Sequence, residues 1–306
     1  MNPRERKPSA GLALRWIGTL LALALTVYLL ASEWDDILQA MQEMDALHLG
    51  GAFLLVMVSR ISTVFRWHML LKGSGADIPL KETTRITFAG LFAANFLPTT
   101  VGGDLVRLAG IIVAGYGTAL GTASLVADRL VGMAGMAVFA PFGAARVLAA
   151  NALAAPAGAL AVALPGRLWE KVKRLIRKFF DILRTWARRP QSLLASLFFT
   201  FIHMGVWFAA MALLLDGLND PMPYFLIASL WSLVYFVTLL PVSINGLGLQ
   251  ELSIAYIFAT FGGISDHNSL VLGLVFRLLV AIASLPGALF VGKLMPELKR
   301  AESTLG

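Results

Sequence analysis

The chain has 306 residues, of which 58% are hydrophobic and 14% are charged, and its mean hydropathy is +0.77. Several apolar runs can cross a hydrocarbon core of about 30 Å and no strand-like alternation is present, so the sequence predicts an all-α, polytopic membrane helix bundle rather than a barrel. The absence of cysteine excludes disulfides, thiolate zinc sites and cysteine nucleophiles. The net charge of +7 is first a signal of membrane topology, and we expect no nucleic-acid partner.

The first predicted span covers residues 12–31. A signal peptide is the alternative, but its apolar region would be shorter and no small-x-small cleavage site precedes Glu33, so the sequence favours an uncleaved anchor. The loop that follows carries acids and no Lys or Arg, as expected on the outer side. Four basic residues precede the span or lie at its start, which predicts a cytoplasmic N-terminus: Arg4, Arg6, Lys7 and Arg15.

The second predicted span, 47–71, runs inward and contains several polar side chains. We expect Arg66 and His68 to snorkel to the inner interface beside Trp67. Arg60 lies deeper in the span and is a candidate for facing a cavity. Basic residues then mark a cytoplasmic loop: Lys72, Lys81 and Arg85.

An interrupted stretch follows at residues 95–107, where apolar sequence carries Pro98, two glycines, an acid and an arginine. Backbone groups freed by Pro and Gly at membrane depth need protein or water as partners, and ionisable side chains there usually face the bundle interior. The flanking segments, 84–97 and 103–117, correspond to roughly 21–23 Å of helix each, which is short for a full crossing. We therefore predict a re-entrant hairpin that enters from the cytoplasm, with its tip lining a substrate cavity.

Residues 118–140 predict a full span outward, and the Ala-rich segment 142–164 predicts a return span. Residues 166–189 have apolar side chains at three- and four-residue spacing and basic residues on the other face. This pattern predicts an amphipathic helix in the inner membrane interface. Its alternative role is only to set the topology.

The second half of the chain has spans predicted at 192–215 and 269–292, separated by a second interrupted stretch at 239–251. In the two stretches Pro98 aligns with Pro241 and Gly103 aligns with Gly246. Two interrupted hydrophobic segments in corresponding halves indicate the binding site of a transporter. The alternative is two unrelated Pro-Gly kinks, which are common in membrane helices.

The order of a span, a broken pair and a span thus occurs twice within a single transmembrane domain, 1–306. The first copy covers about 47–141 and opens to the cytoplasm, and the second covers about 192–293 and opens outward. Opposite orientation predicts an inverted-topology repeat, the plan of many secondary transporters. Basic residues after the last span place the C-terminus in the cytoplasm: Lys293, Lys299 and Arg300.

Polar residues inside apolar sequence are the candidate substrate-binding residues. Asp104 and Arg107 share one helix face, as a cap with a local ion pair or as part of a site. Asp128 is expected to pair with Arg107 or Arg60. The candidates are Arg60, Asn95, Thr99, Thr100, Gly102, Gly103, Asp104, Arg107, Asp128, Arg129, Asn245, Gly246, Glu251 and Arg277.

The sequence also suggests how particular residues are used. Helix N–H groups beside Thr99 and Thr100 would suit a phosphate oxygen. Arg277 is expected to bind an anionic substrate or Glu251. His203 is expected to be satisfied by a neighbouring helix, and Gln250 would line the second tip.

No H-E-x-x-H, G-x-S-x-G or Walker pattern is present in the sequence, and four scattered histidines do not form a metal site. We therefore expect a protein that is not an enzyme and has no cofactor. Without a soluble nucleotide-binding domain, transport would use an ion gradient or run downhill.

The Asn95–Arg107 tip, the Asp128-Arg129 pair and the second tip together resemble the lysylphosphatidylglycerol synthase transmembrane family, over about residues 15–295. This family includes the flippase part of the bacterial multiple peptide resistance factor. The resemblance implies a bacterial inner-membrane protein that moves a polar or charged lipid between leaflets. It places these residues at family motif positions: Asn95, Pro98, Gly102, Gly103, Asp104, Arg107, Asp128, Arg129, Asn245, Gly246 and Glu251.

The sequence therefore predicts a lipid flippase whose partners are membrane lipids with anionic headgroups. No aminoacyl-transferase sequence is present, so we expect no lipid synthesis by the same polypeptide. Two alternatives stay open. One is an accessory subunit that presents a lipid carrier to a separate glycosyl- or aminoacyl-transferase, and the other is a secondary transporter of small solutes.

Overall fold

The computed structural model describes residues 44–95, 102–154, 190–239 and 246–292, with isolated positions between 24 and 42. Within these ranges the chain is helical, without strands. The predicted anchor at 12–31, the amphipathic helix at 166–189 and the centres of both tips lie outside them, apart from isolated positions of the anchor. Four described helices are long and apolar enough to cross a membrane: Ala46–Gly73, Thr118–Ala150, Pro190–Gly217 and Asp266–Gly292. The chain is therefore an all-α, multi-pass membrane protein.

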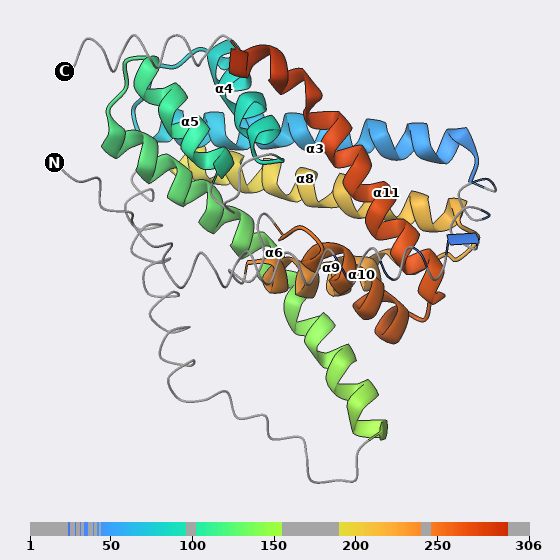
Figure 1. Cartoon of the computed structure of the whole chain (residues 1–306). Coiled ribbons are helices and arrows are strands. Elements are labelled where there is room, and N and C mark those ends of the chain that lie inside the picture. The colour runs from blue at the N-terminus through green and yellow to red at the C-terminus, as the bar shows by residue number, and fades with distance from the viewer. Residues whose placement is uncertain are drawn as a thin grey trace, which may run out of the picture.

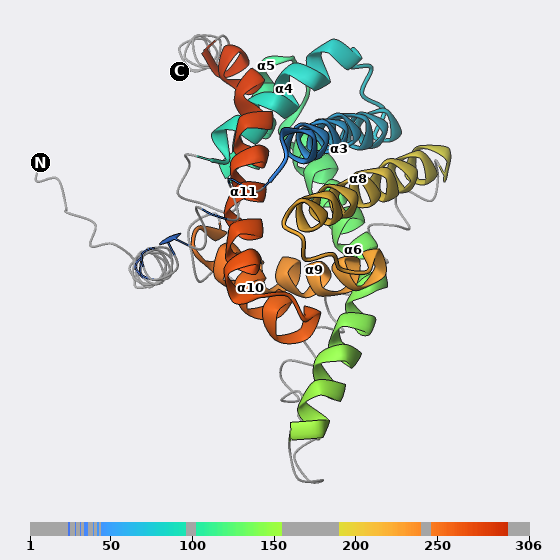
Figure 2. The ribbon, with the colours of Figure 1, turned by 90° about the vertical axis from the view of Figure 1, so that its right-hand side faces the viewer.

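An antiparallel pair, α3 (Ala46–Gly73) and α8 (Pro190–Gly217), forms the centre of the bundle, and Figures 1 and 2 show the two helices side by side. His48 Nε2 lies 3.4 Å from Asp216 at one end of the pair. At the other end the ring of Phe65 stacks on that of Phe199, with 5.1 Å between centroids. The two halves of the chain therefore contact each other through their first described helices, α3 and α8.

Two pairs of short helices follow these long ones. α4 (Leu80–Ala93) packs on α5 (Gly102–Val113), and α9 (Tyr224–Thr238) packs on α10 (Leu249–Ile257). At 14, 12, 15 and 9 residues they extend roughly 14–23 Å, less than a hydrocarbon core. α10 continues into one π-helical turn, η2 (Phe258–Gly262). Short helices flank each interruption, α4 and α5 are close to the lengths predicted for the first pair, and the re-entrant path stays a prediction.

The prediction that the chain turns back at residue 141 is wrong. α6 (Thr118–Ala154) continues through Pro141 as one helix, which Figure 1 shows running away from the rest of the bundle. Proline removes a hydrogen bond inside a helix but does not force a reversal, and membrane helices tolerate it where neighbours pack against the freed backbone. The fourth long helix, α11 (Asp266–Ser284), likewise continues through the short 3₁₀ turn η3 (Leu285–Gly287) to residue 292.

The contacts between helices occur in matched pairs. α3 packs on α4 as α8 packs on α9, and α5 packs on α6 as α10 packs on α11. Between the halves, α6 packs on α9 and the end of α11 packs on α4. Two copies of one plan explain these pairs, and the inverted repeat stays a prediction that they support.

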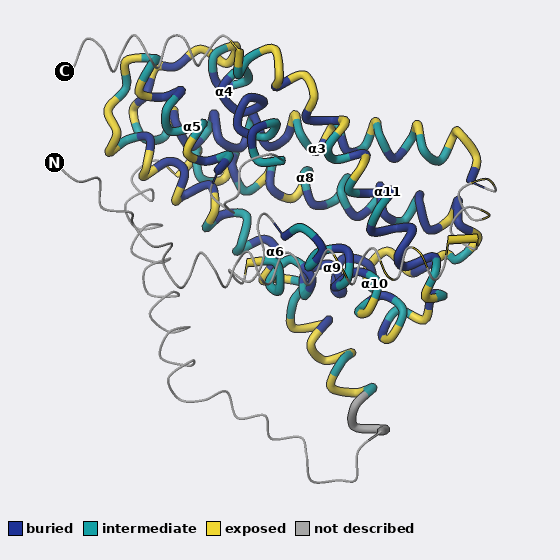
Figure 3. The backbone as a smooth tube through the Cα atoms, in the orientation of Figure 1, coloured by how far each residue is buried: buried dark blue, intermediate teal, exposed yellow. Residues whose placement is uncertain are grey.

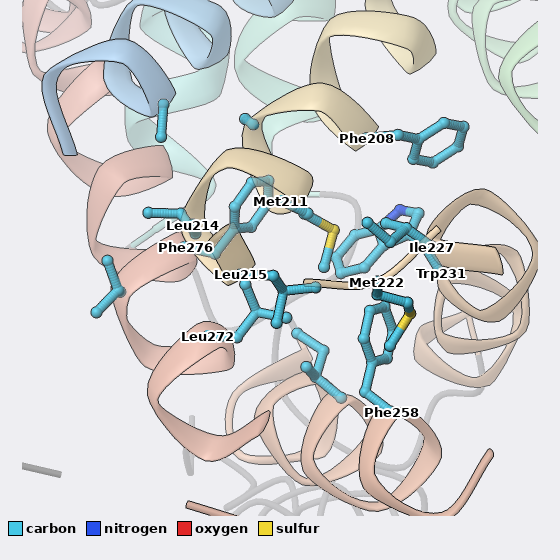
Figure 4. Close-up of a cluster of buried hydrophobic side chains, with 14 of the residues drawn as sticks. Phe208, Met211, Leu214, Leu215, Met222, Ile227, Trp231, Phe258, Leu272 and Phe276 are labelled. Carbon is cyan, nitrogen blue, oxygen red and sulfur yellow. The ribbon is translucent and has the colours of Figure 1, made fainter. Parts of the chain in front are cut away.

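Most of the buried apolar side chains gather where α8, α9, α10 and α11 meet, and Figure 3 shows buried stretches of the backbone there. Figure 4 shows Phe208, Met211, Ile227, Trp231 and Phe276 converging there. A smaller cluster around the fully buried Trp67 joins the end of α3 to α4, α5 and α6. These two packed regions border the cavity described next.

Candidate functional site

A cavity of about 770 Å³ lies between the two halves of the described chain. Ala94 and Gly103 reach it from the flanks of the first interrupted stretch, and Leu239 and Gly246 reach it from the flanks of the second. Both stretches therefore border the same space. Among the described residues its walls carry four arginines and two aspartates, a formal excess of two positive charges: Arg60, Arg66, Arg107, Arg129, Asp104 and Asp128.

Five of these side chains form one continuous chain of ion pairs across α3, α5 and α6. Arg66 Nε donates to Asp128 Oδ1 at 2.7 Å, and Arg107 Nη1 donates to Asp128 Oδ2 at 3.0 Å. Arg107 Nη1 also donates to Asp104 Oδ1 at 3.2 Å, and Arg129 Nε donates to Asp104 Oδ2 at 2.7 Å. We call this set of five the charge network.

The charge network is buried at one end and open at the other. The side chain of Asp128 is 2% exposed and that of Arg107 is 8% exposed, whereas that of Arg129 is 46% exposed. A buried charge is tolerated only with close partners, which accounts for the two arginines on Asp128. Arg129 is thus the member most accessible to a ligand.

Close helix packing positions Arg107. A Cβ at Gly90 would lie 2.6 Å from Arg107 Cγ and 2.7 Å from the carbonyl oxygen of Gly103, so glycine lets α4 approach α5. The Arg107 guanidinium carbon lies 4.1 Å from the centroid of the Trp67 ring, a cation–π distance. Its Nε and Nη2 are buried and have no hydrogen-bond partner among the described residues. Asp104 lies in the first turn of α5, where the helix dipole favours an acid.

Arg60 occupies another wall of the cavity, apart from the charge network. Its Nη2 donates to the carbonyl oxygen of Val280 at 3.4 Å, and its guanidinium lies 5.8 Å from the centroid of a Trp207 ring. The structure therefore does not bring Arg60 to Asp128, which was one of the two partners expected from sequence. Arg107, the other expected partner, does bind Asp128.

Glu251 and Arg277 form the expected pair. Arg277 Nη1 lies 2.8 Å from Glu251 Oε1, which joins α10 to α11. Gly273 of α11 packs beside the Glu251 backbone, where an added Cβ would lie at an ordinary contact distance of 3.5 Å. Neither charged residue lines the cavity, so the pair contributes helix packing at this site, and their proposed role toward substrate stays a prediction.

The other candidates are placed as follows. Asn95 Nδ2 donates to Ser284 Oγ at 2.7 Å, which ties the end of α4 to α11, and neither Asn95 nor Gly102 lines the cavity. Gly246 lines the cavity, and its φ of 69° is a left-handed conformation that favours glycine. Three candidates lie outside the described residues: Thr99, Thr100 and Asn245.

The snorkelling expected for Arg66 and His68 is wrong. Both side chains are buried: Arg66 joins the charge network, and His68 Nδ1 lies 3.0 Å from Thr83 Oγ1. The distance in sequence between Arg66 and Asp128 is 62 residues, so no local pattern reveals their contact. The i, i+4 spacing of two residue pairs was a usable signal, because it puts both members of a pair on one side of a helix. These pairs, which line the cavity, are His203 with Trp207 and Trp231 with Tyr235.

His203 is satisfied by a neighbouring helix, as expected. Its Nδ1 lies 2.6 Å from Ser59 Oγ and 3.4 Å from Thr63 Oγ1, both on α3. It also lines the cavity, which the sequence did not indicate.

A comparison with curated proteins gives no match. Among protein families, the pattern described as the lysylphosphatidylglycerol synthase TM region matches residues 15–287. This match covers all the described helices up to η3, including every residue of the charge network. The chain therefore belongs to the family of the lysylphosphatidylglycerol synthase TM region.

Proposed function

We propose that this protein moves a lipid with a polar, anionic headgroup between the two leaflets of a membrane. The observation that carries the proposal is an arginine-rich cavity lined by the membrane-length helices α3, α6 and α8 and by the short helices at the flanks of both interrupted stretches. Arginine presents several N–H donors in one plane and binds phosphate oxygens in pairs. A volume of about 770 Å³ lies within the range of small-molecule sites, so a headgroup fits.

The cavity margin is apolar where the acyl tails would lie. Leu105 and Val126 line the cavity, and they are 58% and 41% exposed. A lipid can therefore place its headgroup beside Arg129 while its tails stay in the hydrocarbon. A soluble solute has no acyl tails to cover this apolar margin, which favours a lipid over the small-solute alternative.

Movement of the two halves against each other would expose the cavity to one leaflet and then the other. The matched contacts of the halves support this alternating-access mechanism, in which headgroup and arginines stay together while the helices tilt. We propose a bacterial inner membrane as the location, with both chain termini in the cytoplasm, and no covalent chemistry.

Purified protein in liposomes tests the proposal, with fluorescent phosphatidylglycerol whose accessibility to an impermeant quencher reports its leaflet. We expect the wild type to move the lipid, and Arg107→Ala and Arg129→Ala to slow it by about tenfold or more, as for a lost hydrogen bond to a charged group. Arg85→Ala is the matched control, because Arg85 pairs with Glu82 on α4 and does not line the cavity. Wild-type protein that moves no more lipid than empty liposomes contradicts the proposal.

A further inference from the structure

Arg60 differs from the other arginines of the cavity in its partners. Each arginine of the charge network bonds a carboxylate, whereas Arg60 has no carboxylate partner among the described residues. Its one hydrogen bond among the described residues is long, at 3.4 Å to a carbonyl oxygen, and its Nε is buried without a partner in the described part of the chain. A half-buried cation inside a membrane-length helix, with a buried and unpaired Nε, calls for an anion.

Trp207 provides a second donor at the same place. Its Nε1 is also buried without a hydrogen-bond partner among the described residues, and the Arg60 guanidinium lies over its ring at 5.8 Å. Both side chains line the cavity. Guanidinium and indole are donor-only groups, so each of them needs an acceptor, which an anion in the cavity would supply.

This pair of donors is separate from the charge network. Arg60 and Arg66 are six residues apart on α3, which is roughly 9 Å along the helix axis. Asp128 bonds Arg66 and Arg107 and leaves Arg60 free of carboxylate contact. The charge network has three arginines and two aspartates, so it carries one excess positive charge, and Arg60 supplies one more.

On the basis of the proposed function, we infer that Arg60 and Trp207 form a second acceptor subsite, and that the preferred lipid carries two negatively charged groups in its headgroup. One phosphate binds beside Arg107 and Arg129, and the second binds Arg60 and the Trp207 indole. The two excess charges of the cavity then face the two phosphates of the ligand. A headgroup with one phosphate fills only one subsite.

Two lipids with identical tails test the inference: phosphatidylglycerol, and phosphatidylglycerol phosphate, which adds one terminal phosphate. Transport in liposomes and lipid binding to detergent-solubilised protein, followed by native mass spectrometry, are measured for both lipids. We expect the wild type to prefer the bisphosphate by about tenfold, the effect of one charged hydrogen-bonded contact. Arg60→Gln should reduce that ratio to about one, and Arg60→Lys should retain part of it.

Trp207→Phe tests the indole donor, because phenylalanine keeps an aromatic ring against Phe276 and lacks the N–H, although its single ring is smaller than the indole. It should lower the bisphosphate preference severalfold. Arg85→Gln is the control outside the cavity and should keep the preference of the wild type. An equal loss for both lipids in Arg60→Gln, or no wild-type preference, overturns the inference.

The binding measurement keeps this inference distinct from the proposed function. Bisphosphate preference in binding that depends on Arg60, without transport of either lipid, supports the subsite and contradicts the flippase. Transport of both lipids without preference supports the flippase and contradicts the subsite. Displacement of bound lipid by inorganic pyrophosphate at equal concentration assigns the subsite to a soluble diphosphate and contradicts a lipid ligand.

Discussion

At the scale of single residues, Asp128 is the charge on which the site depends. Its carboxylate is almost fully buried and accepts from Arg66 at 2.7 Å and from Arg107 at 3.0 Å. Without it the two guanidinium groups face each other with no anion between them, in surroundings where water screens little. The same carboxylate joins α3 to α5 through α6.

Asp128→Asn should therefore destabilise the protein by about 3–5 kcal/mol, as measured for broken buried ion pairs, and lower its melting temperature in detergent. Glu82→Gln is the matched control. Glu82 pairs with Arg85 at 3.3 Å across one turn of α4 with both side chains partly exposed, and such a pair contributes about 0–1 kcal/mol. Equal melting temperatures for the two variants would contradict a structural role for the charge network.

At the scale of helices, two glycines allow the halves of the chain to touch through their backbones. Gly143 of α6 lies against the carbonyl oxygen of Ser229 on α9, and Gly287 after α11 lies against the carbonyl oxygen of Phe88 on α4. Each glycine follows shortly after a proline inside a continuing helix, Pro141 and Pro286. These corresponding contacts indicate where the backbones of the two halves pack against each other.

Gly287→Ala should force α11 away from α4, because the added Cβ would overlap the backbone of Phe88. Overpacking of this kind costs about 1–3 kcal/mol, which a melting curve in detergent detects. Gly292→Ala, five residues later in the same helix, is the control, because its Cβ would meet nothing within 4 Å. Alanine there should be neutral or slightly stabilising. If the first variant melts like the second, the close contact is not required.

At the scale of the whole molecule, charge separates the two ends of the bundle. Asp45, Asp216 and Asp220 lie at the end where α3 begins and α8 finishes, and Asp220 Oδ2 accepts from Ser265 N at 2.8 Å, which joins two loops of that end. Lys72 lies in the last turn of α3, at the opposite end, and Lys81 and Arg85 lie near it at the start of α4. A basic end and an acidic end are what the positive-inside rule expects of a protein that spans a membrane.

The absence of natural cysteine allows a direct test of this orientation by labelling single introduced thiols. Lys81→Cys and Pro221→Cys replace exposed residues at the two ends. An impermeant thiol reagent added outside intact cells should label Pro221→Cys at once, and Lys81→Cys only after the membrane is permeabilised. The reverse pattern would invert the proposed topology and the direction in which each half opens.

Sequence predicted much of the fold, and the reasons are local. Membrane helices follow from runs of apolar residues, and short helix pairs follow from the Pro and Gly that interrupt those runs. The contact of Asp104 with Arg107 follows from i, i+3 spacing on one helix face. The pairing of Glu251 with Arg277 was one of two expectations for an arginine deep in a span, and the structure contains it.

What sequence alone determined is thus which segments enter the membrane and which charged residues they carry there. Only the tertiary structure decided which polar side chains meet across helices, as Arg66 meets Asp128 and Asn95 meets Ser284, and that the Glu251–Arg277 pair lies outside the cavity. It also decided that α6 continues past Pro141. The reason is that helix periodicity is local, whereas partners on different helices depend on how those helices are rotated and displaced against one another.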